Sequence, residues 1–162
     1  MNVRVAVLTV SDEGAAGRRK DTSGGLIIAW IDAQGYELSV RDVVPDESDL
    51  IAGLLARWSD SGSTDLIVTT GGTGLGPRDV TPEATRSVLE REAPGIAEAI
   101  RTDGRATTPF SVLSRGLCGV RGRTLIVNLP GSTGGVRDGV DTLTPLIEHT
   151  VQLLRNEETD HA

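Results

Sequence analysis

The chain has 162 residues, a usual length for one domain, and its 16 basic and 23 acidic side chains give a formal net charge of −7 at pH 7. This balance argues against a nucleic-acid backbone as the main partner, because such binding needs a basic face that displaces counterions. No apolar run approaches the ~18 residues of a membrane helix, and the N-terminus lacks the apolar stretch of a signal peptide, so we expect no membrane contact, a cytoplasmic protein and a single domain over residues 1–162.

The N-terminal part of the chain predicts a strand, a helix and a second strand. Residues 3–10 are mostly apolar and β-branched, which is typical of a strand buried on both faces. After a loop, Thr22 or Ser23 is expected to cap a helix that ends before Gly35. Residues 37–44 alternate in polarity and predict the second strand.

The middle of the chain continues the alternation. A turn at residues 45–48 leads into a helix with one apolar face that includes Trp58. Residues 65–70 predict a third buried strand, and the glycine-rich loop 71–76 follows it at once. Thr81 is expected to cap the next helix, with proline at its first position.

The remaining elements complete the same pattern. Pro94-Gly95 is expected to end that helix, and residues 96–101 predict another. We interpret residues 107–122 as a loop with a short strand or hairpin, and residues 124–129 as the fourth strong strand. One C-terminal helix is expected over residues 136–154, with a polar tail from Asn156. Strands that alternate with helices predict a three-layer α/β/α fold with a mainly parallel sheet covered on both faces.

Unusual loops follow three of the predicted strands. These are Ser11-Asp12, the glycine-rich loop 71–76, and residues 130–135. Ligands of open parallel sheets bind outside the carboxyl ends of the strands, so the three loops are expected to meet at one edge. Glycines allow close backbone approach and let several N–H groups converge, which suits an anion, although a glycine in any single loop can simply make a tight turn.

Several common anion sites are excluded. The loop at residues 72–77 lacks the last glycine of a dinucleotide fingerprint and follows the third strand rather than the first. Lys20 is the only lysine and stands in no phosphate-loop motif, and the two histidines, His149 and His161, lie far from the glycine-rich loops. The lone Cys118 cannot form an internal disulfide and is expected to be a buried or half-buried small residue.

Two aspartates near these loops suit a magnesium ion. Asp46 follows the second strand, and Asp79 follows the glycine-rich loop. Phosphoryl and nucleotidyl transfer depend on positioning and charge neutralisation, commonly through Mg²⁺ held by carboxylates. Two structural alternatives stay open: Asp46 can cap the helix after it, and Arg78 with Asp79 can form a surface ion pair of little consequence.

The longest motif brings a family resemblance. Residues 69–85 read Thr-Thr-Gly-Gly-Thr-Gly-Leu-Gly-Pro-Arg-Asp-Val-Thr-Pro-Glu-Ala-Thr, which resembles the signature of molybdenum cofactor biosynthesis proteins of the MogA/MoaB type. Ser114-Arg115, Gly119 to Arg121 and Asn128 to Ser132 resemble the second signature of that family. Ser11-Asp12 and residues 21–24 fit its N-terminal segment, and the resemblance runs from about residue 3 to residue 154.

The resemblance implies a molybdopterin-binding fold and an adenylyltransferase that uses Mg-ATP to adenylylate molybdopterin and releases pyrophosphate. It implies that Asp46 and Asp79 are catalytic and hold Mg²⁺. The residues implied in nucleotide and pterin binding are Ser11, Asp12, Gly71, Gly72, Thr73, Gly74, Arg78, Ser114, Arg115, Asn128, Pro130, Gly131 and Ser132. It also implies a homotrimer and a downstream molybdenum-insertion protein as a partner.

The family also contains MoaB-type paralogues. Residues 78–82 favour the adenylating branch, whereas Pro130-Gly131-Ser132-Thr133 stands where many adenylating members have Pro-Gly-Asn-Pro or Pro-Gly-Gln-Pro. The alternative function is therefore a molybdopterin-binding paralogue without efficient adenylyl transfer.

Overall fold

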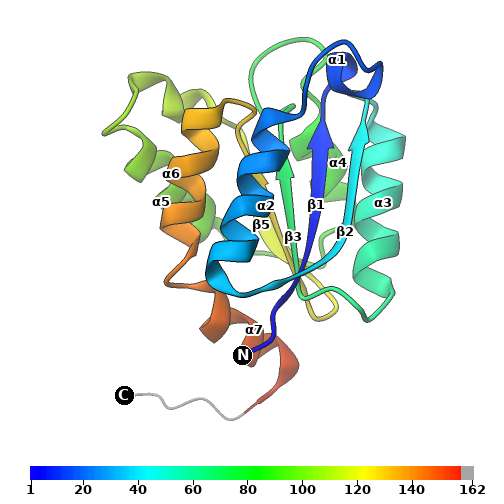
Figure 1. The fold of residues 1–162 in the computed structure, drawn as a ribbon, viewed down its shortest axis with the longest axis vertical. Helices are drawn as coiled ribbons and strands as arrows, with labels where there is room; N and C mark the ends of the chain where they lie inside the picture. Colours follow the sequence, from blue (N-terminus) through cyan, green and yellow to red (C-terminus); the bar gives the residue numbers. More distant parts are fainter. Residues whose placement is uncertain (158–162) are drawn as a thin grey trace.

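A six-stranded sheet forms the centre of the computed structural model, which describes residues 1–157 (Figure 1). The strand order is β2-β1-β3-β6-β5-β4; the first four strands are parallel to one another, and β5 is antiparallel to both β6 and β4. The bounds are β1 (Arg4–Val10), β2 (Glu37–Val44), β3 (Leu66–Thr70), β4 (Arg91–Glu92), β5 (Cys118–Arg121) and β6 (Thr124–Leu129). The predicted mainly parallel sheet is confirmed.

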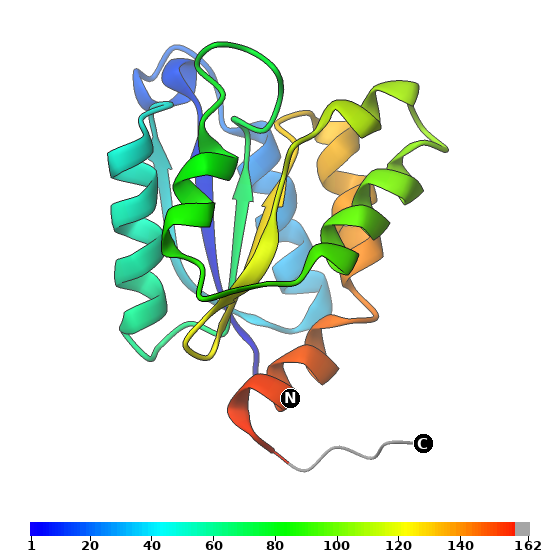
Figure 2. The same ribbon diagram turned by 180° about the vertical axis from the view of Figure 1, so that it is seen from behind.

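Helices cover both faces of this sheet, as Figures 1 and 2 show. They are α1 (Asp12–Ala15), α2 (Thr22–Gln34), α3 (Ser48–Asp60), α4 (Thr81–Val88), α5 (Pro94–Gly104), the 3-10 helix η1 (Pro109–Leu113), α6 (Thr133–Leu143) and α7 (Ile147–Arg155). Helices α3 and α4 pack on one face, and α2, α5 and α6 pack on the other. The fold is thus the predicted three-layer α/β/α arrangement. Within residues 1–157, every helix is too short or too polar to cross a membrane.

Alternation along β1 explains why its sequence is apolar almost throughout. Val5 and Val7 belong to the core beneath α2 and α6, whereas Ala6 and Leu8 belong to the core beneath α3 and α4. A strand in the middle of a sheet with helices on both sides must offer apolar side chains to both cores. Cys118 lies in the first of these cores and is buried, as predicted.

The chain changes face between β1 and β3, which are adjacent in the sheet. The segment after β1 leads to α2 on one face, and the segment after β3 leads to α4 on the other. Because the two connections diverge, they leave a crevice outside the carboxyl ends of these strands, where open α/β sheets bind ligands. The fold therefore places the predicted loops at its topological switch point.

The C-terminal helix expected over residues 136–154 is two helices. Helix α6 ends at Leu143 and α7 begins at Ile147. Pro145 explains the break, because it has no N–H to donate and its ring clashes with the carbonyl of the preceding turn. The Leu146 N–H instead donates to the Leu143 carbonyl at 2.8 Å and closes a tight turn. Of the predicted polar tail, residues 158–162 lie outside the described residues.

Other helix ends also differ from the prediction. Asp21, rather than Thr22 or Ser23, caps α2, with its carboxylate accepting from the Gly24 N–H at 3.0 Å. Thr81 is the first residue of α4 rather than its cap. Pro94 begins α5 instead of ending α4, which already stops at Val88 before the short edge strand β4.

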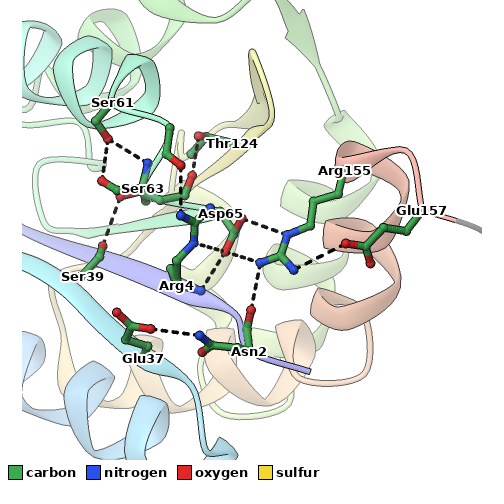
Figure 3. A network of polar contacts seen from close by, with 12 residues as sticks. Asn2, Arg4, Glu37, Ser39, Ser61, Ser63, Asp65, Thr124, Arg155 and Glu157 are labelled. Atoms are coloured by element: carbon green, nitrogen blue, oxygen red, sulfur yellow. Dashed lines mark hydrogen bonds and ion pairs between the residues drawn. The ribbon is translucent and has the colours of Figure 1, made fainter.

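Helix α7 is tied to the sheet through Asp65, as Figure 3 shows. Asp65 directly precedes β3, so this contact lies at the end of the sheet opposite the loops. The Asp65 carboxylate accepts from the Arg4 guanidinium at 2.9 Å and from that of Arg155 at 2.7 Å. Its side chain is only 3% exposed, and this burial opposes ionisation. Because the two guanidinium groups and the Arg4 backbone N–H outweigh burial, the pKa of Asp65 falls to about 2.

Candidate functional site

The first and larger cavity lies at the switch point. Its volume is about 800 Å³, and polar groups from the ends of β1 and β3 and from the first turns of α2 and α6 surround it. It is lined by Thr9, Val10, Ser11, Gly14, Arg19, Lys20, Asp21, Thr22, Ser23, Asp46, Thr70, Gly71, Gly72, Asp79, Gly131, Ser132 and Thr133. The predicted convergence of the three loops at one edge is confirmed.

A second cavity adjoins the first. Its volume is about 470 Å³, and it lies between the glycine-rich loop, α5, η1 and the start of α6. Ile100, Phe110 and Leu113 give it a more apolar wall than the first. Both cavities share four lining residues: Gly72, Asp79, Gly131 and Ser132. The shared wall places a carboxylate and backbone N–H groups where two bound molecules could meet.

Gly71 is required by the packing of the strand ends. Its φ of 97° lies in the left-handed region, and a Cβ there would be 2.2 Å from the Val10 carbonyl oxygen. Gly131 also packs closely against it, since a Cβ on Gly131 would lie 3.2 Å from the Gly71 Cα. Side chains at these positions would push β1, β3 and the loop after β6 apart, so glycine is what lets the loops share one site.

Two helix N-termini face the first cavity. Thr22 and Ser23 open α2, and Ser132, the N-cap of α6, accepts a hydrogen bond from the Gly135 N–H at 3.1 Å. The unpaired N–H groups and the dipole at a helix N-terminus favour negative charge. Together with the glycine-rich backbone, they make this cavity suited to phosphate groups.

Asp46 and Asp79 both line the first cavity. The Asp46 carboxylate accepts from the Asp12 N–H at 3.1 Å, and Asp79 accepts from the Gly76 N–H at 2.8 Å. Burial raises the pKa of Asp46, and the nearby charges of Asp12 and Asp79 raise it further. The cavity therefore gathers negative charge that a bound cation would offset.

Neither structural alternative for these aspartates holds. Glu47, not Asp46, is the N-cap of α3, and it makes no side-chain capping bond. Arg78 pairs with Asp12 rather than Asp79, through donors at 2.7 and 2.9 Å. Hydrogen bonding from Arg78 lowers the pKa of Asp12 to about 2. Asp46 is thus not a helix cap, and Asp79 is not paired with Arg78.

The donor set fits a substrate-bound magnesium ion rather than a closed metal cage. Within residues 1–157, no group of three or more histidine, cysteine or acidic side chains is arranged to hold a metal. Mg²⁺ is commonly bound through one or two carboxylates together with water and substrate phosphates. Asp46 and Asp79 supply two carboxylates beside a cavity suited to phosphate, which meets that requirement.

Most of the predicted binding residues come together at these cavities. Those that line one or both are Ser11, Gly71, Gly72, Thr73, Gly74, Ser114, Pro130, Gly131 and Ser132. Asp12 and Arg78 line neither cavity; their ion pair instead connects α1 to the end of the glycine-rich loop.

Arg115 and Asn128 also line neither cavity and serve the frame behind them. Arg115 donates to the Gly74 and Asp79 carbonyls at 2.9 Å each and pairs with Glu83, so it braces the glycine-rich loop. Asn128 is 3% exposed. Its carbonyl accepts from the Leu117 N–H at 3.1 Å, and its amide N–H₂ donates to two threonine hydroxyls.

The sequence reading missed part of each wall. The unpredicted residues of the first cavity include Arg19 and Lys20 in the loop before α2, and those of the second cavity include apolar residues such as Ile100 and Phe110. The adjacent basic pair just before a helix start was a usable signal for the first set. The second set lies on α5 and η1, whose positions over β6 depend on tertiary packing.

Together, fold and site define a class: an α/β protein whose switch-point cavity is suited to phosphorylated ligands. Residues 6–149 match the family described as a probable molybdopterin binding domain, and the chain belongs to that family. It is 36% identical over 156 residues to the molybdopterin adenylyltransferase of Helicobacter pylori strain J99, covering 94% of this chain and 88% of that protein.

Two further relatives extend the comparison. The chain is 42% identical over 157 residues to the molybdenum cofactor synthesis protein cinnamon of Drosophila melanogaster, covering 96% of this chain but only 26% of that longer protein. The crystal structure of the molybdopterin biosynthesis enzyme MoaB from Thermus thermophilus superimposes with a TM-score of 0.90 at 47% identity, covering 96% of this chain and 98% of that one.

Proposed function

We propose that this protein acts in molybdenum cofactor biosynthesis as a molybdopterin adenylyltransferase that uses Mg-ATP. The observation that carries the proposal is the pair of cavities with a common wall. A reaction that joins two organic phosphates needs two binding spaces and one place where the phosphates meet. Gly72, Asp79, Gly131 and Ser132 provide that place, and family membership supports molybdopterin as one of the two ligands.

The chain's own residues position the reaction. The terminal phosphate oxygen of molybdopterin attacks the α-phosphorus of ATP, a new P–O bond forms, and the bond from that phosphorus to the oxygen bridging to the β-phosphate breaks. Backbone N–H groups of the glycine-rich loop and the N-terminus of α6 orient the phosphates and stabilise their charge. Positioning of the two phosphates and stabilisation of their charge together supply most of the rate gain in such transfers.

Asp46 and Asp79 would hold Mg²⁺ when the substrates are bound. The ion supplies neutralisation of phosphoryl charge, which favours the transfer. Asp46 has a partner that keeps it in place, because its carboxylate accepts from the Asp12 backbone. Ser11, Gly71, Thr73, Gly74, Ser114 and Pro130 complete the nucleotide and pterin contacts, while Arg78, Arg115, Asp12 and Asn128 support them from behind.

The cellular setting is part of the same proposal. We place the protein in the cytoplasm as a homotrimer that hands adenylylated molybdopterin to a molybdenum-insertion protein. The supporting feature is membership of the molybdopterin-binding family.

Incubation with molybdopterin and Mg-ATP, followed by chromatography for the adenylylated pterin, tests the proposal. We expect product from the wild type and at least ~100-fold less from Asp46→Asn and Asp79→Asn, by analogy with the loss of a key charge-stabilising group. Asp60→Asn is the matched control, because Asp60 is exposed and pairs with Arg121 outside both cavities. Pterin binding without product from the wild type would assign the protein to the MoaB-type binding paralogues instead.

A further inference from the structure

Three consecutive basic residues stand in the loop between α1 and α2, and they differ in their surroundings. Arg18 is paired with Glu13, with donor and acceptor 2.9 Å apart, and it lines neither cavity. Arg19 and Lys20 both line the first cavity. Within residues 1–157, their side chains make no hydrogen bond or ion pair, so their charges are available to a ligand.

The backbone fixes this basic pair at the cavity rim. The loop turns at Gly17, whose φ is 73°, and ends at Asp21, the N-cap of α2. Asp21 accepts from the Thr9 hydroxyl and from the Arg41 guanidinium, both at 2.9 Å, so it is held by β1 and β2 together. Lys20 therefore directly precedes a residue that is fixed to the sheet, and this holds Arg19 and Lys20 at the cavity.

Charge at the first cavity is separated into two parts. Among residues 1–157, Arg19 and Lys20 are the only basic residues that line it, and they lie at the side of α2. The acidic lining residues are Asp21, which is already paired with Arg41, and the two proposed magnesium ligands, Asp46 and Asp79. A ligand that fits both parts carries more negative charge than one phosphate, and it needs a cation at one end and basic side chains at the other.

We propose that Arg19 and Lys20 bind the β- and γ-phosphates of ATP in the first cavity and so select a nucleoside triphosphate over a monophosphate. This inference rests on the proposed function. When the bond from the α-phosphorus to its bridging oxygen breaks, that oxygen keeps the electron pair and leaves as part of pyrophosphate. Arg19 and Lys20 stabilise the added charge, and the N-terminus of α2 lies beside them.

The test compares nucleotide binding by isothermal titration calorimetry in the presence of Mg²⁺. We expect the Arg19→Ala/Lys20→Ala variant to bind ATP about 10- to 100-fold more weakly, as expected for the loss of charge-assisted hydrogen bonds, with AMP affinity unchanged. Inorganic tripolyphosphate should compete with ATP for the wild type, and it should no longer compete with ATP for the variant. Arg18→Ala is the matched control and should bind all three probes like the wild type.

The outcomes separate this inference from the proposed function. Equal losses of ATP and AMP affinity in the double variant, or no loss of either, would overturn the triphosphate assignment even if adenylyl transfer continues. A wild type that binds neither nucleotide would overturn both proposals. Selective loss of ATP affinity in the variant would support the role of Arg19 and Lys20 in triphosphate binding. If the wild type then gave no adenylylated pterin, only the proposed transferase function would be overturned.

Discussion

Asp46 and Asp12 are joined by two reciprocal hydrogen bonds: each backbone N–H donates to the other's carboxylate, at 3.1 and 3.0 Å. The pair connects the carboxyl ends of β1 and β2. Arg78, which follows the glycine-rich loop, donates two hydrogen bonds to the same Asp12 carboxylate. One aspartate that lines neither cavity thus positions a proposed magnesium ligand and the loop beside it.

Replacing Asp12 tests this positioning. In Asp12→Ala the Asp46 N–H and Arg78 lose their acceptor, so adenylyl transfer should fall about 10-fold, as for loss of a residue that orients a metal ligand. The unfolding free energy should change little, because the Arg78 pair is exposed. Product formation and urea denaturation measure the two effects. Glu13→Ala, the exposed neighbour, should leave transfer unchanged; an equal loss there would remove the special role of Asp12.

Gly71 provides a test of the close packing of the strand ends. Gly71→Ala meets both a φ of 97° and a Cβ contact of 2.2 Å with the Val10 carbonyl oxygen. We expect a loss of about 3 kcal/mol or more in unfolding free energy, because a strained backbone and a backbone clash add together. Gly134→Ala is the control: its Cβ would meet nothing within 4 Å inside α6, so it should stabilise the fold by up to about 1 kcal/mol. Similar thermal denaturation of both variants would argue against the close packing.

Asn128 distinguishes a framework residue from a ligand contact. Asn128→Ala leaves the Leu117 N–H and the Thr69 and Thr85 hydroxyls without their partner, which should cost about 2–3 kcal/mol of unfolding free energy. Pterin and nucleotide affinities of the folded variant should stay within about twofold of the wild type, because Asn128 lines neither cavity. Ser132→Ala is the opposite case: it should lower affinity, and the loss of the α6 cap should cost about 1 kcal/mol. Calorimetric titrations that show a larger loss of ligand affinity in Asn128→Ala than in Ser132→Ala would contradict this assignment.

Asp65 predicts a dependence of stability on pH. Its pKa is about 2 in the folded protein, below its ordinary 3.8. A carboxylate with a lowered pKa contributes stability above the unfolded value, and that contribution is lost as pH falls from about 4 through about 2. The difference in pKa corresponds to about 2 kcal/mol at neutral pH.

Asp65→Asn should therefore lower the unfolding free energy at pH 7 by about 2–4 kcal/mol, because Arg4 and Arg155 also lose their partner. The gap to the wild type should close as pH approaches 2. Asp60→Asn removes an exposed carboxylate, so its unfolding free energy should stay close to that of the wild type at any pH. Chemical denaturation across this range measures both. A gap that stays constant down to pH 2 would show that charge at Asp65 is not the cause.

Local patterns predicted the strands well because each strand has to serve two cores, and this leaves a clear apolar signature in β1, β3 and β6. The break at Pro145 was not predicted, although the sequence contained the signal for it, since proline inside a helical pattern removes a donor. Alternation could have placed Asn128 too: it stands two residues after Ile126 and so faces α4 rather than the cavities.

Other features were beyond a single sequence. The loop position of Arg115 says nothing about the Gly74 and Asp79 carbonyls that its side chain finds, because those contacts come from elements far apart in the chain. Likewise the two-residue strand β4 forms only where β5 offers it an edge. The positions of candidate residues follow from strand ends, whereas the directions of their side chains follow from packing.

The wall shared by the two cavities has a kinetic consequence. On the proposed assignment, each substrate occupies one cavity, but the adenylylated product is a single molecule that occupies both. The product is a bivalent ligand. When one end dissociates, the bound end keeps the free end at high effective concentration, so rebinding is faster than complete dissociation. The product should thus dissociate more slowly than either substrate, and its release should limit turnover. An acceptor protein that binds one end of the product would accelerate this release.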